Sequence, residues 1–212
     1  MDDVKALIET LEMSLTSSTK NKRAWTAGLR QSARGLWAGV FTVEEFNSMM
    51  FRVLNKGLTA AWNRGFMELG ISPDEQDDTE RQRVFNIIIE QTSLMDGLTR
   101  FITDNSKANG GKLKRVNQRV ALWERRYEQV QNEAKARASG NKKLEWVLGV
   151  AEHCPSCVRL SGQVRRGGFW LSNGILPAVP GADYLECKGY KCKCQLKPTT
   201  KPSSRGKMPR LP

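Results

Sequence analysis

Residues 153 to 194 read HCPSCVRLSGQVRRGGFWLSNGILPAVPGADYLECKGYKCKC, and they contain all five cysteines and the one histidine of the chain. The stretch opens with a C-x2-C pair, Cys154 and Cys157, and three more cysteines follow between residues 187 and 194. Zinc takes four ligands in a tetrahedron and binds thiolates well. Disulfides of a secreted protein would rarely cluster in this way, and an odd number of cysteines favours metal binding. We therefore predict that residues 152 to 196 fold around a structural zinc ion.

Five cysteines exceed the four positions of a tetrahedral zinc site. From the number and spacing of the cysteines we predict Cys154, Cys157 and Cys187 as ligands, whereas Cys192 and Cys194 compete for the fourth position. Four thiolates leave no open coordination position, so we expect a structural and not a catalytic metal. The alternatives are free buried thiols or disulfides.

The chain before this stretch is dominated by apolar residues at helical spacing. We predict helices over residues 4–15 and 21–38, a third beginning at Thr42 and ending before Gly70, and a fourth from Ser72 to Ile102. Thr42 with an acidic residue three positions later is the pattern of a capping box, and a glycine is typical just after a helix. Residues 103–111 are loop-like in composition.

Residues 113 to 134 carry the most regular pattern, with apolar residues separated alternately by three and four positions. This heptad seam predicts a helix that buries one stripe and turns its basic residues outward. Those basic residues are Lys112, Arg115, Arg119, Arg126 and Lys135. Such a face is most simply a solvated one, and the alternative is a surface that contacts phosphates.

The sequence thus predicts a mainly α fold, in which a helical domain over residues 1–143 precedes a small zinc-stapled module with short β-strands over residues 144–198. Residues 144–150 have the composition of a strand that leads into the module. Residues 199–212 form a basic, proline-rich tail. Because the tail has few apolar groups to offset the entropy of ordering, we predict that it is disordered unless a partner holds it.

The charge balance favours acidic partners. The chain has 34 Lys and Arg against 22 Asp and Glu, a net charge of +12. Arg165 and Arg166, within the module, add to the candidate phosphate contacts. A run of about 18 apolar residues, as a membrane span requires, is missing from the sequence, and its first residues are unlike a secretory signal, so we expect a cytoplasmic protein with no membrane partner.

The residue types speak against an enzyme. His153 is the one histidine, it stands beside a predicted zinc ligand, and we interpret it as a surface residue. A metal-dependent nuclease of the histidine type needs several such groups. The acidic residues between 74 and 80 are typical of a helix start. We expect no catalytic site.

The pattern from Trp146 to Leu196 has the form W-V-L-G…C-x2-C-x2-L-x-G-x-V…W…P-x-x-P-G…L-x-C-x-G-x-x-C-x-C-x-L. It resembles the C-terminal signature of the phage head-morphogenesis, or minor head protein, family. Cys154, Cys157, Leu160 and Gly162 match the first half of that signature. The resemblance covers about 50 residues, and the helical remainder adds weaker support.

The closing pair of the signature corresponds to Cys192 and Cys194, and Cys187 stands where the family often has histidine. The second cysteine of the pair varies among relatives, so the resemblance favours Cys192 over Cys194 as the fourth ligand. It also implies a virion component assembled in the cytoplasm of a bacterial host, with the portal or the major capsid protein as partner and possible contact with DNA. Exposed Phe46, Met49 or Met50 could form the partner surface. The alternative is a zinc-containing nucleic-acid-binding protein of phage or prophage origin.

Overall fold

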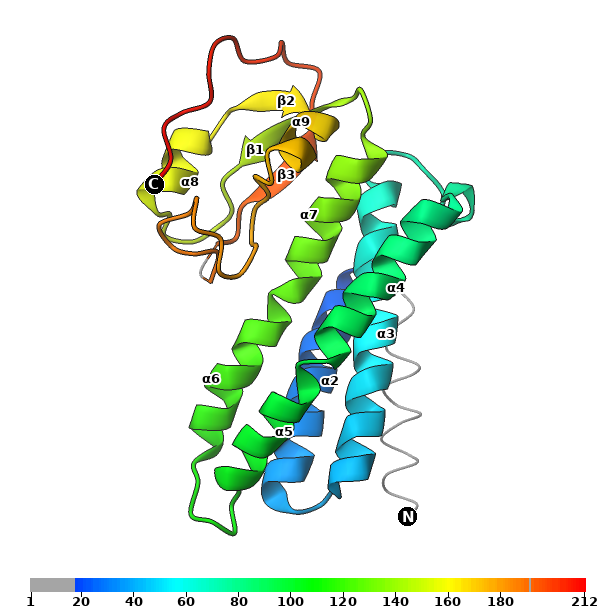
Figure 1. Ribbon diagram of the computed structural model, residues 1–212, viewed down its shortest axis with the longest axis vertical. Coiled ribbons are helices and arrows are strands. Elements are labelled where there is room, and N and C mark those ends of the chain that lie inside the picture. The colour runs from blue at the N-terminus through cyan, green and yellow to red at the C-terminus, as the bar shows by residue number, and fades with distance from the viewer. Residues whose placement is uncertain (1–17, 191) are drawn as a thin grey trace. The chain divides into compact units, whose positions relative to one another are not determined.

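The computed structural model describes residues 18–190 and 192–212, and in these residues the chain is mainly helical, with a small three-stranded sheet near the C-terminus (Figure 1). The predicted fold class is therefore confirmed. The predicted helix over residues 4–15 lies outside the described residues. In the described part of the chain, the helices are too short or too polar to cross a membrane.

The chain forms two compact units, which we describe separately. The helical unit comprises the described residues up to 61 and residues 77–127, and the cysteine unit comprises residues 62–76 and 128–212 without residue 191. The predicted boundary at residue 143 followed composition, whereas the units follow contacts, so the cysteine unit also includes helical segments that precede this boundary.

The helical unit contains α2 (Ser18–Ala38), most of α3 (Val43–Met67), α4 (Asp78–Thr92), α5 (Met95–Asp104) and α6 (Leu113–Glu124). Its core is apolar: Trp25, Leu29 and Leu58 are fully buried. The indole N–H of Trp25 donates to the Glu124 carbonyl at 3.0 Å, and this bond ties α2 to the end of α6.

The predicted start of α3 is confirmed. The Glu45 amide donates to Thr42 Oγ1 at 3.2 Å, while the Thr42 amide donates to Glu45 Oε2 at 2.9 Å, so both halves of the capping box are formed. Gly70, in the left-handed region at φ 76°, follows the end of α3 as predicted.

The helix predicted from residue 72 begins later and is divided. Pro73–Glu75 is only a 3-10 turn, η1, and α4 begins at Asp78, where Asp77 and Glu80 form a second capping box. The helical run then breaks between α4 and α5. Near the break the Ser93 hydroxyl donates to the Glu90 carbonyl at 2.8 Å, and such hydroxyl groups compete with the helical backbone bonds.

The predicted seam over residues 113–134 is buried in the two helices that carry it, α6 and α7 (Arg126–Ala138). Its members from Val116 onward are at most 8% exposed: Val116, Val120, Trp123, Tyr127, Val130 and Ala134. The hypothesis that Phe46, Met49 or Met50 forms an exposed partner surface is wrong, because all three are buried in α3.

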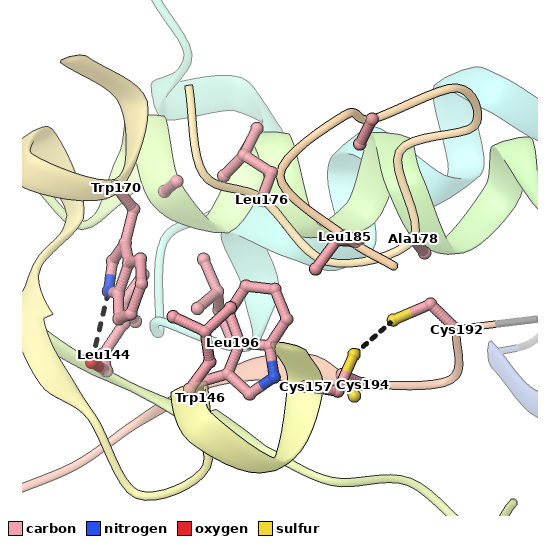
Figure 2. Close-up of a cluster of buried hydrophobic side chains, with 13 residues drawn as sticks. Leu144, Trp146, Cys157, Trp170, Leu176, Ala178, Leu185, Cys192, Cys194 and Leu196 are labelled. Carbon is pink, nitrogen blue, oxygen red and sulfur yellow. Dashed lines mark hydrogen bonds between the residues drawn. The ribbon is translucent and has the colours of Figure 1, made fainter. Parts of the chain in front are cut away.

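The cysteine unit contains the end of α3, η1, most of α7 and a sheet in the order β2-β1-β3, with both pairs antiparallel. The strands are β1 (Lys143–Val147), β2 (Val164–Arg166) and β3 (Gln195–Pro198), and two short helices, α8 (Pro155–Leu160) and α9 (Gly167–Ser172), flank β2 in the chain. The predicted strand over 144–150 is β1, which ends at Val147. Trp146 and Trp170 pack in its core with ring centroids 5.8 Å apart (Figure 2).

The C-terminal tail differs from the predicted disorder. The amide of Val164 donates to Ser204 Oγ and its carbonyl accepts from the Ser204 amide, both at 2.9 Å. Arg165 donates to the carbonyl of Ser204 and, at 3.0 Å, to that of Gly206. The tail supplies partners to the backbone groups of the edge strand β2. Its few apolar residues add to this, because Met208 and Leu211 pack against the core of the cysteine unit.

Candidate metal centre

The cysteines come from three segments of the cysteine unit. Cys154 is the residue before α8, and Cys157 lies in the first turn of that helix, so their side chains share one face. Cys192 and Cys194 lie directly before β3. Cys187 lies in the loop between α9 and β3, which the Ser156 hydroxyl fastens to α8 by accepting from the Glu186 amide at 3.0 Å.

A glycine is needed to close this loop. Gly189 has φ 70°, and a Cβ atom there would lie 1.9 Å from the Val179 carbonyl oxygen. Any side chain would therefore force the two loop segments apart. The close approach thus fixes the path of the loop between Cys187 and Cys192.

The sulfur atoms form two overlapping groups. The Sγ atoms of Cys154, Cys157 and Cys187 all lie within 4.8 Å of one another, and so do those of Cys157, Cys192 and Cys194. Cys157 belongs to both groups, and its Sγ lies 3.8 Å from that of Cys192 (Figure 2). The five cysteines therefore lie close enough to hold a metal ion.

The spacing fits metal binding better than disulfide formation. A disulfide requires about 2.05 Å between sulfurs, whereas two ligands of a tetrahedral zinc site, each about 2.3 Å from the metal, lie roughly 3.8 Å apart. The Cys157 to Cys192 distance of 3.8 Å agrees with the second value. All five cysteines are free thiols. An all-sulfur donor set suits zinc and other soft metals.

The thiols perturb one another strongly. Hydrogen bonding with Cys192 raises the pKa of Cys157, and the same contact lowers the pKa of Cys192 to about 3. Hydrogen bonding with Cys157 lowers the pKa of Cys194, but hydrogen bonding with Cys192 and burial outweigh it and raise that pKa to about 12. Burial also raises the pKa of Cys187.

These opposite shifts have one physical cause. Several thiolates cannot lie together in a buried site, so in each group of three one thiolate, Cys154 or Cys192, is stabilised while its neighbours stay protonated. A divalent cation removes this conflict, because it displaces the protons and neutralises the thiolates that bind it. The cluster is therefore electrostatically suited to a cation.

His153 lies at the edge of the cluster. Its Nδ1 is 3.9 Å from Cys194 Sγ, but the histidine belongs to neither group of donors. The side chain is half-buried. Its interpretation as a surface residue, not a ligand, stays a prediction.

The basic residues predicted to contact nucleic acid lie in both units. Lys112, Arg115 and Arg119 are exposed at and along α6. The guanidinium groups of Arg115 and Arg119 lie over the ring of Phe101, at 5.8 and 5.7 Å from its centroid. Arg126 begins α7 and is half-buried.

The prediction that Lys135 faces outward is wrong. Its side chain is 1% exposed, and its Nζ lies 3.0 Å from Glu68 Oε2. The seam predicted one buried stripe, but β3 also packs on this part of α7, where the Leu196 amide donates to Asn132 Oδ1 at 3.0 Å. Contacts on several sides of α7 leave no solvated face for Lys135.

Arg165 and Arg166 have different surroundings. Arg165 is engaged by the C-terminal tail, and its guanidinium lies 5.3 Å from the Phe169 ring centroid. Arg166 is exposed, with a long contact of 3.5 Å to Asn141 Oδ1. Arg165 therefore has a structural role that its sequence context did not reveal.

The sequence interpretation missed two residues that shape the cluster. Ser156 was treated only as a spacer between two cysteines, but its hydroxyl holds the Cys187 loop. Trp146 was named only as the first residue of the motif, but its indole nitrogen lies beside the cysteines (Figure 2).

Comparison of the chain with protein-family models, with curated proteins and with solved structures gave no match. The resemblance described above therefore depends on the sequence pattern of this chain alone.

Proposed function

We propose that this chain is a minor head protein of a tailed phage or prophage, that it acts in head assembly at or near the portal, and that zinc staples its C-terminal module. The gathering of five cysteine sulfurs in one small core carries the proposal. The chain would have a structural role without catalytic residues. Its partner would be the portal or the major capsid protein.

The roles of the signature residues support this proposal. In the stretch C-x2-C-x2-L-x-G, Leu160 is fully buried against the cysteines, and Gly162 has φ 76° at the turn that leads from α8 to β2. Each fixed position of the motif thus has a physical role: the two cysteines are candidate metal ligands, the leucine is a core residue and the glycine forms a turn. A shared motif of this kind is consistent with a shared module.

Zinc would contribute most of the stability of the cysteine cluster. Structural zinc contributes roughly 10–16 kcal/mol in small metal-binding modules, which replaces the burial that a loop-rich segment lacks. The metal content of protein purified under reducing conditions tests this directly, and we expect one zinc per chain by elemental mass spectrometry. Cys157→Ser should abolish it, whereas Ser161→Ala, an exposed change at the end of α8, should not. A folded wild-type protein without metal would contradict the zinc assignment.

The assembly role needs a separate experiment. Mass spectrometry of purified phage particles and of empty proheads should find this chain at a few copies for each particle, measured against the major capsid protein. Presence in both preparations would support a minor head protein. Absence from both would refute the assembly role while leaving the zinc site untouched.

Binding of nucleic acid is the second candidate function, and it is favoured by the C-terminal sequence. Residues 187–212 contain eight basic residues and no acidic one. Those that the structure describes are all exposed: Lys188, Lys193, Lys197, Lys201, Arg205, Lys207 and Arg210. Lys201 is paired with Glu145 at 2.7 Å, so the others are the better phosphate contacts.

Fluorescence anisotropy with a labelled DNA duplex tests this function. We expect binding at low salt that weakens steeply as salt is added, because each neutralised phosphate releases counterions. Replacing Lys193 and Lys197 by alanine should reduce the salt dependence, and replacing Arg115 and Arg119 in α6 compares the other candidate face. No anisotropy change at low salt would exclude this second function.

A further inference from the structure

Two tryptophans share the core of the cysteine unit, and only one of them has a partner for its N–H group. Trp146 and Trp170 are both fully buried. The Trp170 indole donates to the Leu144 carbonyl at 3.3 Å. The Trp146 indole nitrogen is also buried, but it makes no hydrogen bond of ordinary geometry with a described residue. Trp62 in α3 is a second buried indole without such a bond in the described part of the chain. Because buried indole N–H groups nearly always find an acceptor, the Trp146 nitrogen needs an explanation from its own surroundings.

The cysteine sulfurs provide one. In Figure 2 the nitrogen of Trp146 is on the side of the ring that faces Cys157 and Cys194. The side chain of Trp146 lies within hydrogen-bonding reach of the Cys194 thiol. A neutral thiol is a weak acceptor, whereas a thiolate accepts a charge-assisted bond that is considerably stronger.

We propose that Cys194 is one of the thiolates that bind the metal, and that the indole N–H of Trp146 is its outer-sphere hydrogen-bond donor. This inference rests on the zinc centre proposed above. A metal-bound thiolate keeps much of its negative charge and has lone pairs that do not bind the metal, so it supplies the acceptor that the buried indole lacks. Groups that donate to metal ligands in this way orient the ligand and tune its affinity.

The inference changes the expected ligand set. Cys194 shares a group with Cys157 and Cys192, and these three are the most buried of the cysteines. They would supply three donors, and one member of the neighbouring pair Cys154 and Cys187 would complete the tetrahedron. Cys192 and Cys194 are then both ligands, not rivals.

Cobalt substitution gives a spectroscopic signal that a change in side-chain packing alone would not alter. Titration of the reduced protein with Co²⁺ reports the affinity and the thiolate-to-cobalt charge-transfer band. Trp146→Phe keeps an aromatic ring but removes the N–H, and we expect about 10- to 100-fold weaker binding and a band shifted to lower energy. Trp170→Phe makes the same change in the adjacent ring, and it should alter neither the affinity nor the band. Equal behaviour of the two variants would overturn the inference.

Cysteine variants and the wild-type protein provide independent tests. Cys194→Ser should weaken cobalt binding and lower the charge-transfer intensity, and Trp146→Phe should have no further effect in that background. An unchanged band in Cys194→Ser would overturn the assignment. In the ¹¹³Cd-loaded wild-type protein, one indole proton should show scalar coupling to cadmium, and this resonance should be lost in Trp146→Phe and kept in Trp170→Phe. Absence of the coupling would count against the inference, and absence of any metal binding would refute the zinc centre itself.

Discussion

The buried ion pair between Lys135 and Glu68 predicts an unequal response when either partner is neutralised. Lys135 is 1% exposed in its side chain, whereas that of Glu68 is 27% exposed. Glu68 also accepts from Arg64 Nε at 3.0 Å and from Gln131 Nε2 at 2.7 Å. The carboxylate would therefore keep two partners and some water without the lysine. The ammonium, by contrast, has no hydrogen bond of good geometry to another described group.

The expected magnitudes follow from this difference. Removing one partner of a buried pair costs about 3–5 kcal/mol, because the other charge stays buried. For Glu68→Gln we expect about 3 kcal/mol, at the low end because Glu68 is partly hydrated. Lys135→Met keeps the buried aliphatic chain without the charge, and it should change the free energy of unfolding by less than about 1 kcal/mol. At roughly 2–4 °C for each kcal/mol, the melting temperature should fall by about 6–12 °C in Glu68→Gln and by less than about 4 °C in Lys135→Met.

Thermal and urea unfolding at pH 7, followed by circular dichroism, measure both variants. The double variant carrying Glu68→Gln and Lys135→Met should recover most of the loss, because no unpaired charge is left. Equal destabilisation by the two single variants, or a double variant as unstable as Glu68→Gln, would refute the reasoning.

Three further predictions concern packing, pH and metal. Gly65→Ala should destabilise the protein by about 2 kcal/mol, because the new Cβ would lie 2.5 Å from Ala134 Cβ. Gly97→Ala, in open space on α5, should stabilise the protein by up to about 1 kcal/mol. Urea unfolding that ranks the two variants the other way would contradict this prediction. Burial raises the pKa of Glu68, but Lys135 and Arg64 outweigh burial and lower it below its ordinary value. Its stabilising effect is therefore complete above the pKa of an unfolded glutamate and is lost as the pH falls through the folded value. The stability difference between wild type and Glu68→Gln should shrink in that acidic range, and a difference that does not vary there would argue against the ion pair. A strong chelator should abolish the near-ultraviolet circular dichroism of Trp146 and Trp170 while hydrogen exchange in α2 and α6 stays slow; an unchanged spectrum would speak against a structural metal.

Much of the helical architecture could be predicted from the sequence because its determinants are local. The capping box at Thr42 and the buried seam from Val116 to Ala134 depend on residues three or four positions apart. Helix breaks were less predictable. The break near Ser93 depends on a hydroxyl that competes with the backbone, and composition does not reveal whether it will do so.

The cysteine spacing alone indicated that cysteines from both ends of the module would meet at one site, because a loop-rich segment with so many potential ligands has few other ways to be stable. It predicted four ligands, whereas all five sulfurs lie in two overlapping groups. The order within the cluster is a property of the tertiary structure. Cys157 lies between two groups of sulfurs only because α8, the Gly189 loop and the start of β3 meet there.

The tertiary structure also decided the roles of single polar residues. The sequence patterns indicated a solvated face for Lys135, a phosphate contact for Arg165 and no role beyond the motif for Trp146. In the folded chain they meet Glu68, the C-terminal tail and Cys194, which lie about forty or more residues away in sequence. Periodicity reports which face of a helix or strand is apolar, because that depends on neighbours in sequence. The partner of a buried charge or N–H group is chosen by segments far along the chain, and only folding brings those segments together.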